Sequence, residues 1–210
     1  MTDKDKLKEF FDHSSIFISC VKSEDFWQDD YYKICLEMLQ IEGRKLESVE
    51  PERFTAEQYL NLCSTAIDQN GSALEWVEAS AAGVENYQNL CYQAVKKNGT
   101  SLYFVKRDLF DHSRNKLREI YRIAVIQNTD ALMLIQDQTL PLCRLAVKRN
   151  ASALQWVNPE LFSKEEYGEI CFLAFYQKQE LILLERLFGE YFDIKYIKNY
   201  QALRFVDKSH

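Results

Sequence analysis

Six cysteines and three histidines are the side chains of this 210-residue chain best suited to nucleophilic catalysis or to metal binding. A thiolate is a nucleophile and a zinc ligand, and an imidazole can serve as its base. Zinc sites need converging ligands, commonly at Cys-x-x-Cys spacing, and no two of these cysteines have it. The histidines, His13, His112 and His210, have no nucleophile at a recognised spacing. The sequence therefore predicts no metal, no cofactor and no catalytic set.

Five of the cysteines recur at one position of a sequence repeat. Three near-identical copies begin at Tyr59, Tyr87 and Thr139; four weaker ones begin at residues 31, 117, 167 and 188, and a half copy covers residues 15–21. With the first residue of each copy counted as position 0, the cysteines stand at position 4. A small apolar side chain suits a core site, so we predict buried, reduced thiols at these positions: Cys35, Cys63, Cys91, Cys143 and Cys171. Cys91 paired in space with His112 is the alternative nucleophile and base.

The register of the repeat also predicts the elements. Apolar residues at positions 0, 3, 4, 7 and 8 form the stripe of an amphipathic helix of about twelve residues. Position 7 is usually alanine, which is expected to let the neighbouring helix come close. Asparagine at position 11 is expected to end the helix in the left-handed conformation. A second, shorter helix would then carry positions 15 and 18 on one face, as in Leu74 with Val77.

These features predict an all-α fold: a helix-pair repeat array, a short right-handed α-solenoid of about seven repeats. Residues 31–210 would form the array and residues 1–30 an N-terminal cap, as one domain. Thr55 with Gln58, and Ser163 with Glu166, have the form of capping boxes at helix starts. The copies that begin at residues 117 and 167 are short, so we expect the link to the next helix to be deleted there.

Charge is unevenly distributed along the chain, whose net charge is −6. Residues 1–95 hold 8 basic and 18 acidic side chains, whereas residues 96–149 hold 11 basic and 5 acidic ones. The acidic total disfavours nucleic acid as a partner. The basic segment is either a solvated face or a contact for an acidic partner, with these candidates: Lys96, Lys97, Arg107, Arg114, Arg118 and Arg122.

Aromatic residues at position 17 are the other candidates for partner binding. Trp76, Phe104 and Trp156 stand there, and Trp27 lies in a separate aromatic segment. Aromatic residues at helical spacing are usually structural, but any that are exposed would be natural binding hot spots. No stretch has the length and apolarity of a membrane span or a secretory signal, so we expect a protein that is cytoplasmic in the producing cell.

The core motif resembles that of a known repeat family of unknown function. Ala94-VKKNGTSLYFV-Val105 and Ala146-VKRNASALQWV-Val157, each ending at the valine named, share the pattern Ala-Val-Lys-x-Asn-(Gly/Ala)-x-(Ala/Ser)-Leu-x-x-Val. Repeats of this kind recur in Legionella effector proteins and in some protists. The resemblance implies a bacterial protein delivered into the host cytosol, and it brings no established catalytic residues.

The sequence thus favours a noncatalytic protein-binding scaffold, either a secreted effector or a regulator of another effector. Its partner would be a host protein or a second bacterial effector. One alternative is an enzyme whose site lies in the nonrepeating links, residues 22–32 and 106–119. Another is a protein that binds phosphoinositides or acidic membrane through residues 96–149.

Overall fold

The computed structural model describes residues 28–178, and every regular element in that range is a helix. The predicted all-α fold is therefore confirmed. Most of the expected cap, Trp27 and the copy that begins at residue 188 lie outside the described residues. The chain divides into two compact units, Met1–Ile120 and Tyr121–His210. None of the helices in residues 28–178 is long and apolar enough to cross a membrane.

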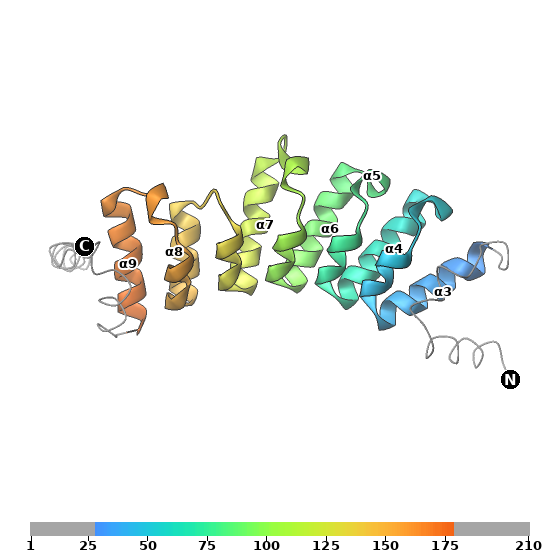
Figure 1. Cartoon of the computed structure of the whole chain (residues 1–210), viewed down its shortest axis with the longest axis horizontal. Coiled ribbons are helices and arrows are strands. Elements are labelled where there is room, and N and C mark those ends of the chain that lie inside the picture. The colour runs from blue at the N-terminus through green and yellow to red at the C-terminus, as the bar shows by residue number, and fades with distance from the viewer. Residues whose placement is uncertain (1–27, 179–210) are drawn as a thin grey trace, which may run out of the picture. The chain divides into compact units, whose positions relative to one another are not determined.

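Long α-helices begin the copies of the repeat (Figure 1). A six-residue 3-10 helix follows each of the first five, and a short link helix follows wherever the copy has its full length. The long helices are α3 (Gln28–Ile41), α4 (Ala56–Gln69), α6 (Val84–Lys97), α7 (Arg114–Gln127), α8 (Leu140–Arg149) and α9 (Lys164–Lys178). The 3-10 helices are η2 (Gly43–Ser48), η4 (Gly71–Trp76), η5 (Gly99–Phe104), η7 (Thr129–Leu134) and η8 (Ala151–Trp156). The link helices are η3 (Pro51–Arg53), α5 (Ala79–Ala82), η6 (Arg107–Phe110) and η9 (Pro159–Leu161).

Positions of the repeat that were predicted to be apolar form the core of both units. All five cysteines of position 4 are buried and free, which confirms the prediction of packed thiols. The alanines of position 7 and the leucines of position 15 are also buried. Within each unit, equivalent positions of the sequence repeat are therefore buried to a similar extent.

The second element of each of the first five copies is a 3-10 helix, where the sequence analysis predicted only a short helix. In a 3-10 helix, residues three apart lie one above the other. Positions 12, 15 and 18 are spaced by three, so all of them face the core, as Gly71, Leu74 and Val77 do. The backbone N–H of position 18 donates to the carbonyl of position 15 and ends the helix, as from Val77 to Leu74 at 3.2 Å.

The prediction of left-handed asparagines was wrong. Asn70 has φ −146° and ψ 111°, which is extended backbone, and Asn98, Asn128 and Asn150 match it closely. Each side-chain oxygen accepts a hydrogen bond from the N–H two residues later, as Asn70 does from Ser72 at 3.0 Å. The asparagine thus caps the start of the 3-10 helix, a role in which asparagine is favoured. Its own N–H also completes the preceding α-helix, as from Asn70 to Ala66 at 2.8 Å.

Position 12 has no room for a side chain in the first two copies, which have glycine there. A Cβ on Gly71 would lie 2.7 Å from the carbonyl oxygen of Ala94, at position 7 of the next copy. Gly43 is more crowded still, by the carbonyl oxygen of Ala66. The small residues at position 7 therefore do allow a close approach, and the element that approaches is the start of the preceding 3-10 helix.

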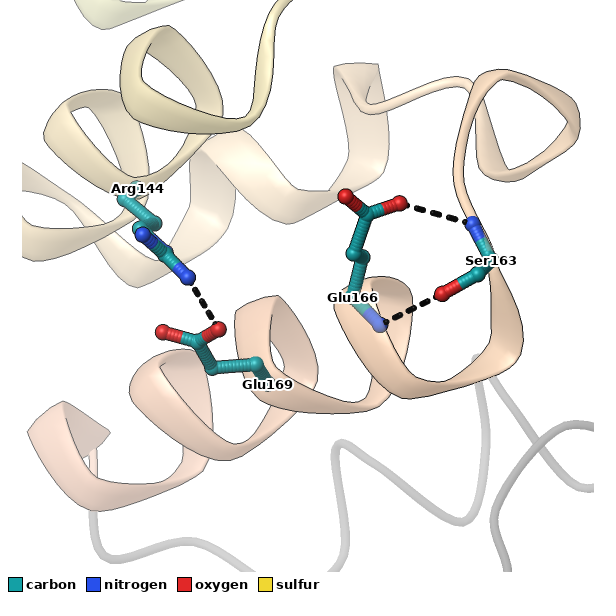
Figure 2. Close-up of polar contacts among 4 residues, drawn as sticks. All are labelled: Arg144, Ser163, Glu166 and Glu169. Atoms are coloured by element: carbon teal, nitrogen blue, oxygen red, sulfur yellow. Dashed lines mark hydrogen bonds and ion pairs between the residues drawn. The ribbon is translucent and has the colours of Figure 1, made fainter.

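Both predicted capping boxes are present. Gln58 N–H donates to Thr55 Oγ1 at 3.2 Å, and Thr55 N–H donates to Gln58 Oε1 at 3.0 Å. Figure 2 shows the matching exchange between Ser163 and Glu166 at the start of α9. The predicted deletion of the link after η7 is confirmed, since residues 135–139 contain no helix.

Two glycine substitutions test the close packing. Gly71→Ala should lower the free energy of unfolding by about 1–3 kcal/mol, because its methyl group meets a backbone carbonyl that cannot easily move. Gly168→Ala should raise it by about 0.5–1 kcal/mol, because Gly168 lies within α9 and its added Cβ would meet nothing within 4 Å. Denaturant unfolding followed by circular dichroism measures both. Equal stability of Gly71→Ala and the wild type would contradict the packing described.

Candidate interaction surface

A row of 3-10 helices forms the candidate surface of the first unit. η2 packs on η4, and η4 packs on η5 (Figure 1). Their inner sides bury positions 12, 15 and 18, so positions 13, 16 and 17 face outward or lie at the edge. We call the side chains at these positions the 3-10 face. Its large or charged members are Arg44, Glu47, Glu75, Trp76, Tyr103 and Phe104.

Tyrosine at position 0 fixes the backbone that carries this face. Tyr59 is buried, and its hydroxyl accepts a hydrogen bond of 3.0 Å from the N–H of Glu78, which follows η4. The Tyr87 hydroxyl accepts from the N–H of Lys106 at 3.1 Å and donates to the carbonyl of Phe104 at 3.3 Å. Each tyrosine thereby ties the start of its own α-helix to the end of its own 3-10 helix.

Gln138 provides the same tie in the second unit, where position 0 is an exposed threonine. Its Oε1 accepts from the N–H of Asn158 at 2.9 Å, and its Nε2 donates to the carbonyl of Trp156 at 2.8 Å. These are the two backbone groups that Tyr87 binds in the third copy, at positions 19 and 17. The amide of Gln138 can replace the tyrosine hydroxyl because each group offers both a hydrogen-bond donor and an acceptor. The sequence analysis predicted neither the tyrosine nor the glutamine hydrogen bonds to the backbone. The only indication of them in the sequence was the tyrosine that recurs at position 0.

The three predicted aromatic residues inside the described range are half-buried, so they lie at the edge of the core. The guanidinium of Arg44 lies 5.3 Å from the centre of the Trp76 ring. Phe104 packs edge-on against Tyr103, with ring centres 5.3 Å apart. Tyr103 has 72% of its surface exposed, and sequence analysis did not single it out. An aromatic side chain so exposed, on a backbone fixed by Tyr87, is a ready contact for a partner.

Trp156 lies in the second unit, where its indole N–H has a hydrogen-bond acceptor. Its indole N–H donates to Asp130 at 3.0 Å, across the adjacent helices η7 and η8. Position 13 of one copy therefore meets position 17 of the next in both units, as Arg44 meets Trp76 and Asp130 meets Trp156. Trp76 and Trp156 therefore each contact a side chain of the preceding copy.

The predicted basic residues are distributed over several elements. Lys96 and Lys97 are exposed on the last turn of α6, where positive charge complements the helix dipole. Arg107 is half-buried in η6, and Arg114 and Arg118 are exposed in the first turns of α7. Arg122 is exposed on the same helix, in the second unit.

The five thiols that the structure describes lack the features of activated nucleophiles. Burial raises the pKa of Cys63 and of Cys91 to about 12, and hydrogen bonds with Tyr59 and Tyr87 lower them by less. Burial also raises the pKa of Cys143 to about 12 and that of Cys35 and Cys171 to about 11. A catalytic thiolate requires the opposite shift. His112 is exposed while Cys91 is fully buried, which disfavours their pairing as base and nucleophile.

Within residues 28–178, no group of three or more acidic, histidine or cysteine side chains could hold a metal ion. No protein-family model, curated protein or solved structure matches the chain. The likeness to the repeat family of unknown function therefore remains a prediction from the Ala-Val-Lys motif.

Removing the hydroxyl of Tyr59 tests the hydrogen bond that joins the start of α4 to the end of η4. Tyr59→Phe should lower the free energy of unfolding by about 1–2 kcal/mol, because the N–H of Glu78 loses its acceptor. Tyr103→Phe is the matched control and should change it by less than about 0.5 kcal/mol, since this side chain is mostly exposed. Denaturant unfolding measures both variants. Similar effects of the two substitutions would show that the hydrogen bond of Tyr59 contributes little to stability.

The raised pKa values predict a loss of stability in alkali. Above about pH 9 the thiols of the unfolded chain ionise, whereas the buried thiols stay protonated until the pH nears their folded pKa of about 11 to 12. The folded state binds more protons there, so its stability should fall as the pH rises from about 9 towards 12. Thermal unfolding at stepped pH measures this. Replacing Cys63 and Cys91 by alanine should make the decline shallower, and an unchanged decline would contradict the assignment to thiols.

Proposed function

We propose that this chain is a noncatalytic scaffold that binds another protein through the 3-10 face of its first unit. The observation that carries the proposal is the pair formed by Tyr103 and Phe104. Tyr103 is 72% exposed beside a half-buried phenylalanine, on a helix whose end is bound by Tyr87. Rigid aromatic side chains give contact area at a small cost in entropy, and they are enriched among binding hot spots.

The buried polar side chains described above support this proposal, because packing accounts for them. Tyr59, Tyr87 and Gln138 bind backbone groups, and the position-4 cysteines are shielded thiols. The outward positions vary from copy to copy, as Glu75, Tyr103 and Met133 do at position 16. A repeat with constant inward and variable outward residues suits a surface specialised for recognition. We infer a role as a bacterial effector, or as a regulator of another effector, from the resemblance of the Ala-Val-Lys motif alone.

Site-specific photocrosslinking tests the proposed surface. A photoreactive phenylalanine replaces Tyr103 on η5 or, as the matched control, Tyr92, which is 41% exposed on α6. Illumination in host and bacterial lysates should give discrete adducts from position 103 that an excess of unlabelled wild-type protein competes away. Tyr103→Ser should reduce recovery of the same partner by about fivefold or more, and Tyr92→Ser by less than about twofold.

Two results would contradict the proposal. One is the absence of any competed adduct from position 103 in either lysate. The other is an identical set of adducts from positions 103 and 92, which would indicate contact without a preferred face.

A further inference from the structure

Three exposed carboxylates stand on the 3-10 face or shortly after η4. Glu47 and Glu75 both stand at position 16, and Glu78 stands at position 19. All three are exposed, and none has an ion-pair partner among residues 28–178. By contrast, Glu50, also at position 19, is paired with Arg53 at 2.5 Å.

The 3-10 geometry places Glu47 and Glu75 on opposite sides of the indole. Residues three apart share one edge of a 3-10 helix, so Glu47 lies on the same edge of η2 as Arg44. Arg44 lies over the Trp76 ring, so that edge of η2 borders the ring. On the other side, Glu75 directly precedes Trp76, and the backbone of Glu78 is fixed by Tyr59.

The Trp76 ring already accepts a guanidinium. Arg44 lies 5.3 Å from the ring centre and is itself exposed, with no carboxylate partner in the described part of the chain. A cation–π contact made by an exposed guanidinium is weak, so Arg44 can be displaced from the ring. An arginine from another protein could therefore take the same place, and the unpaired carboxylates would bind further basic groups beside it.

We propose that the occupant of the 3-10 face is a basic, arginine-containing segment of a partner protein, which places one guanidinium on Trp76 between Glu47, Glu75 and Glu78. This inference rests on the proposed scaffold function and specifies its partner. Charge complementarity favours this occupant over an acidic one, since the other cations of η2 and η3, Lys45 and Arg53, are already paired with Glu42 and Glu50.

Fluorescence anisotropy with defined peptides tests this. The probe is a short, labelled Gly/Ser peptide with two spaced arginines, and the comparison peptides carry citrulline or glutamate in their place. The full-length protein should bind the arginine peptide, at least about fivefold more tightly than either comparison peptide. No binding of the arginine peptide, or equal binding of the citrulline peptide, would overturn the proposal.

Charge-matched variants locate the site. Glu47→Gln with Glu75→Gln should weaken binding of the arginine peptide by about fivefold or more. Glu37→Gln with Asp68→Asn removes the same charge from exposed positions of α3 and α4, and should weaken it by less than about twofold. An equal loss of affinity in the two double variants would mean that the peptide is attracted by the overall negative charge of the protein, and would overturn the proposed site.

A second pair of variants tests the role of the ring. Arg44→Ala should tighten binding of the arginine peptide about threefold more than Lys45→Ala, since both remove one positive charge but only Arg44 occupies Trp76. Equal effects would overturn the placement on the indole. If the arginine peptide fails to bind while photocrosslinking from position 103 still succeeds, the basic partner is refuted and the scaffold function stands.

Discussion

In three of the described copies, a hydrogen bond joins the start of the α-helix, or the segment just before it, to the end of the following 3-10 helix, and the candidate surface depends on this bond. Tyr59, Tyr87 and Gln138 all supply it, and all bind the backbone N–H at position 19. A six-residue 3-10 helix has little stability of its own. Holding its end fixes where positions 16 and 17 emerge, and therefore fixes the surface that a partner would meet.

Close packing between copies adds a second constraint. Gly71 fits against the carbonyl of Ala94 because it has no Cβ, which would lie 2.7 Å from that oxygen. The asparagine of position 11 makes the turn into the 3-10 helix possible, since it completes one helix and caps the next. The residues most repeated in the sequence are thus used for contact within and between copies, and function is left to the outward positions.

The sequence predicted which residues are buried better than it predicted backbone conformation. The register placed Cys63, Ala66 and Leu74 correctly because burial follows directly from apolar periodicity. It did not separate a 3-10 from an α-helix, because residues three apart share a face in both. Asn70 was expected in the wrong conformation for a related reason: asparagine serves helix ends of either kind. Gln138 could not be recognised, because it lies one residue before the tyrosine position whose role it takes.

Hydrogen exchange of single backbone amides tests the central claim most directly. The N–H groups of Glu78, Lys106 and Asn158 belong to exposed residues, yet each is bound by a side chain at or just before the start of its own copy. Glu50 stands at the same position of the first copy, and its N–H has no such bond among the described residues. The account predicts that the first three amides exchange slowly and that of Glu50 quickly. Equally fast exchange of all four would contradict it.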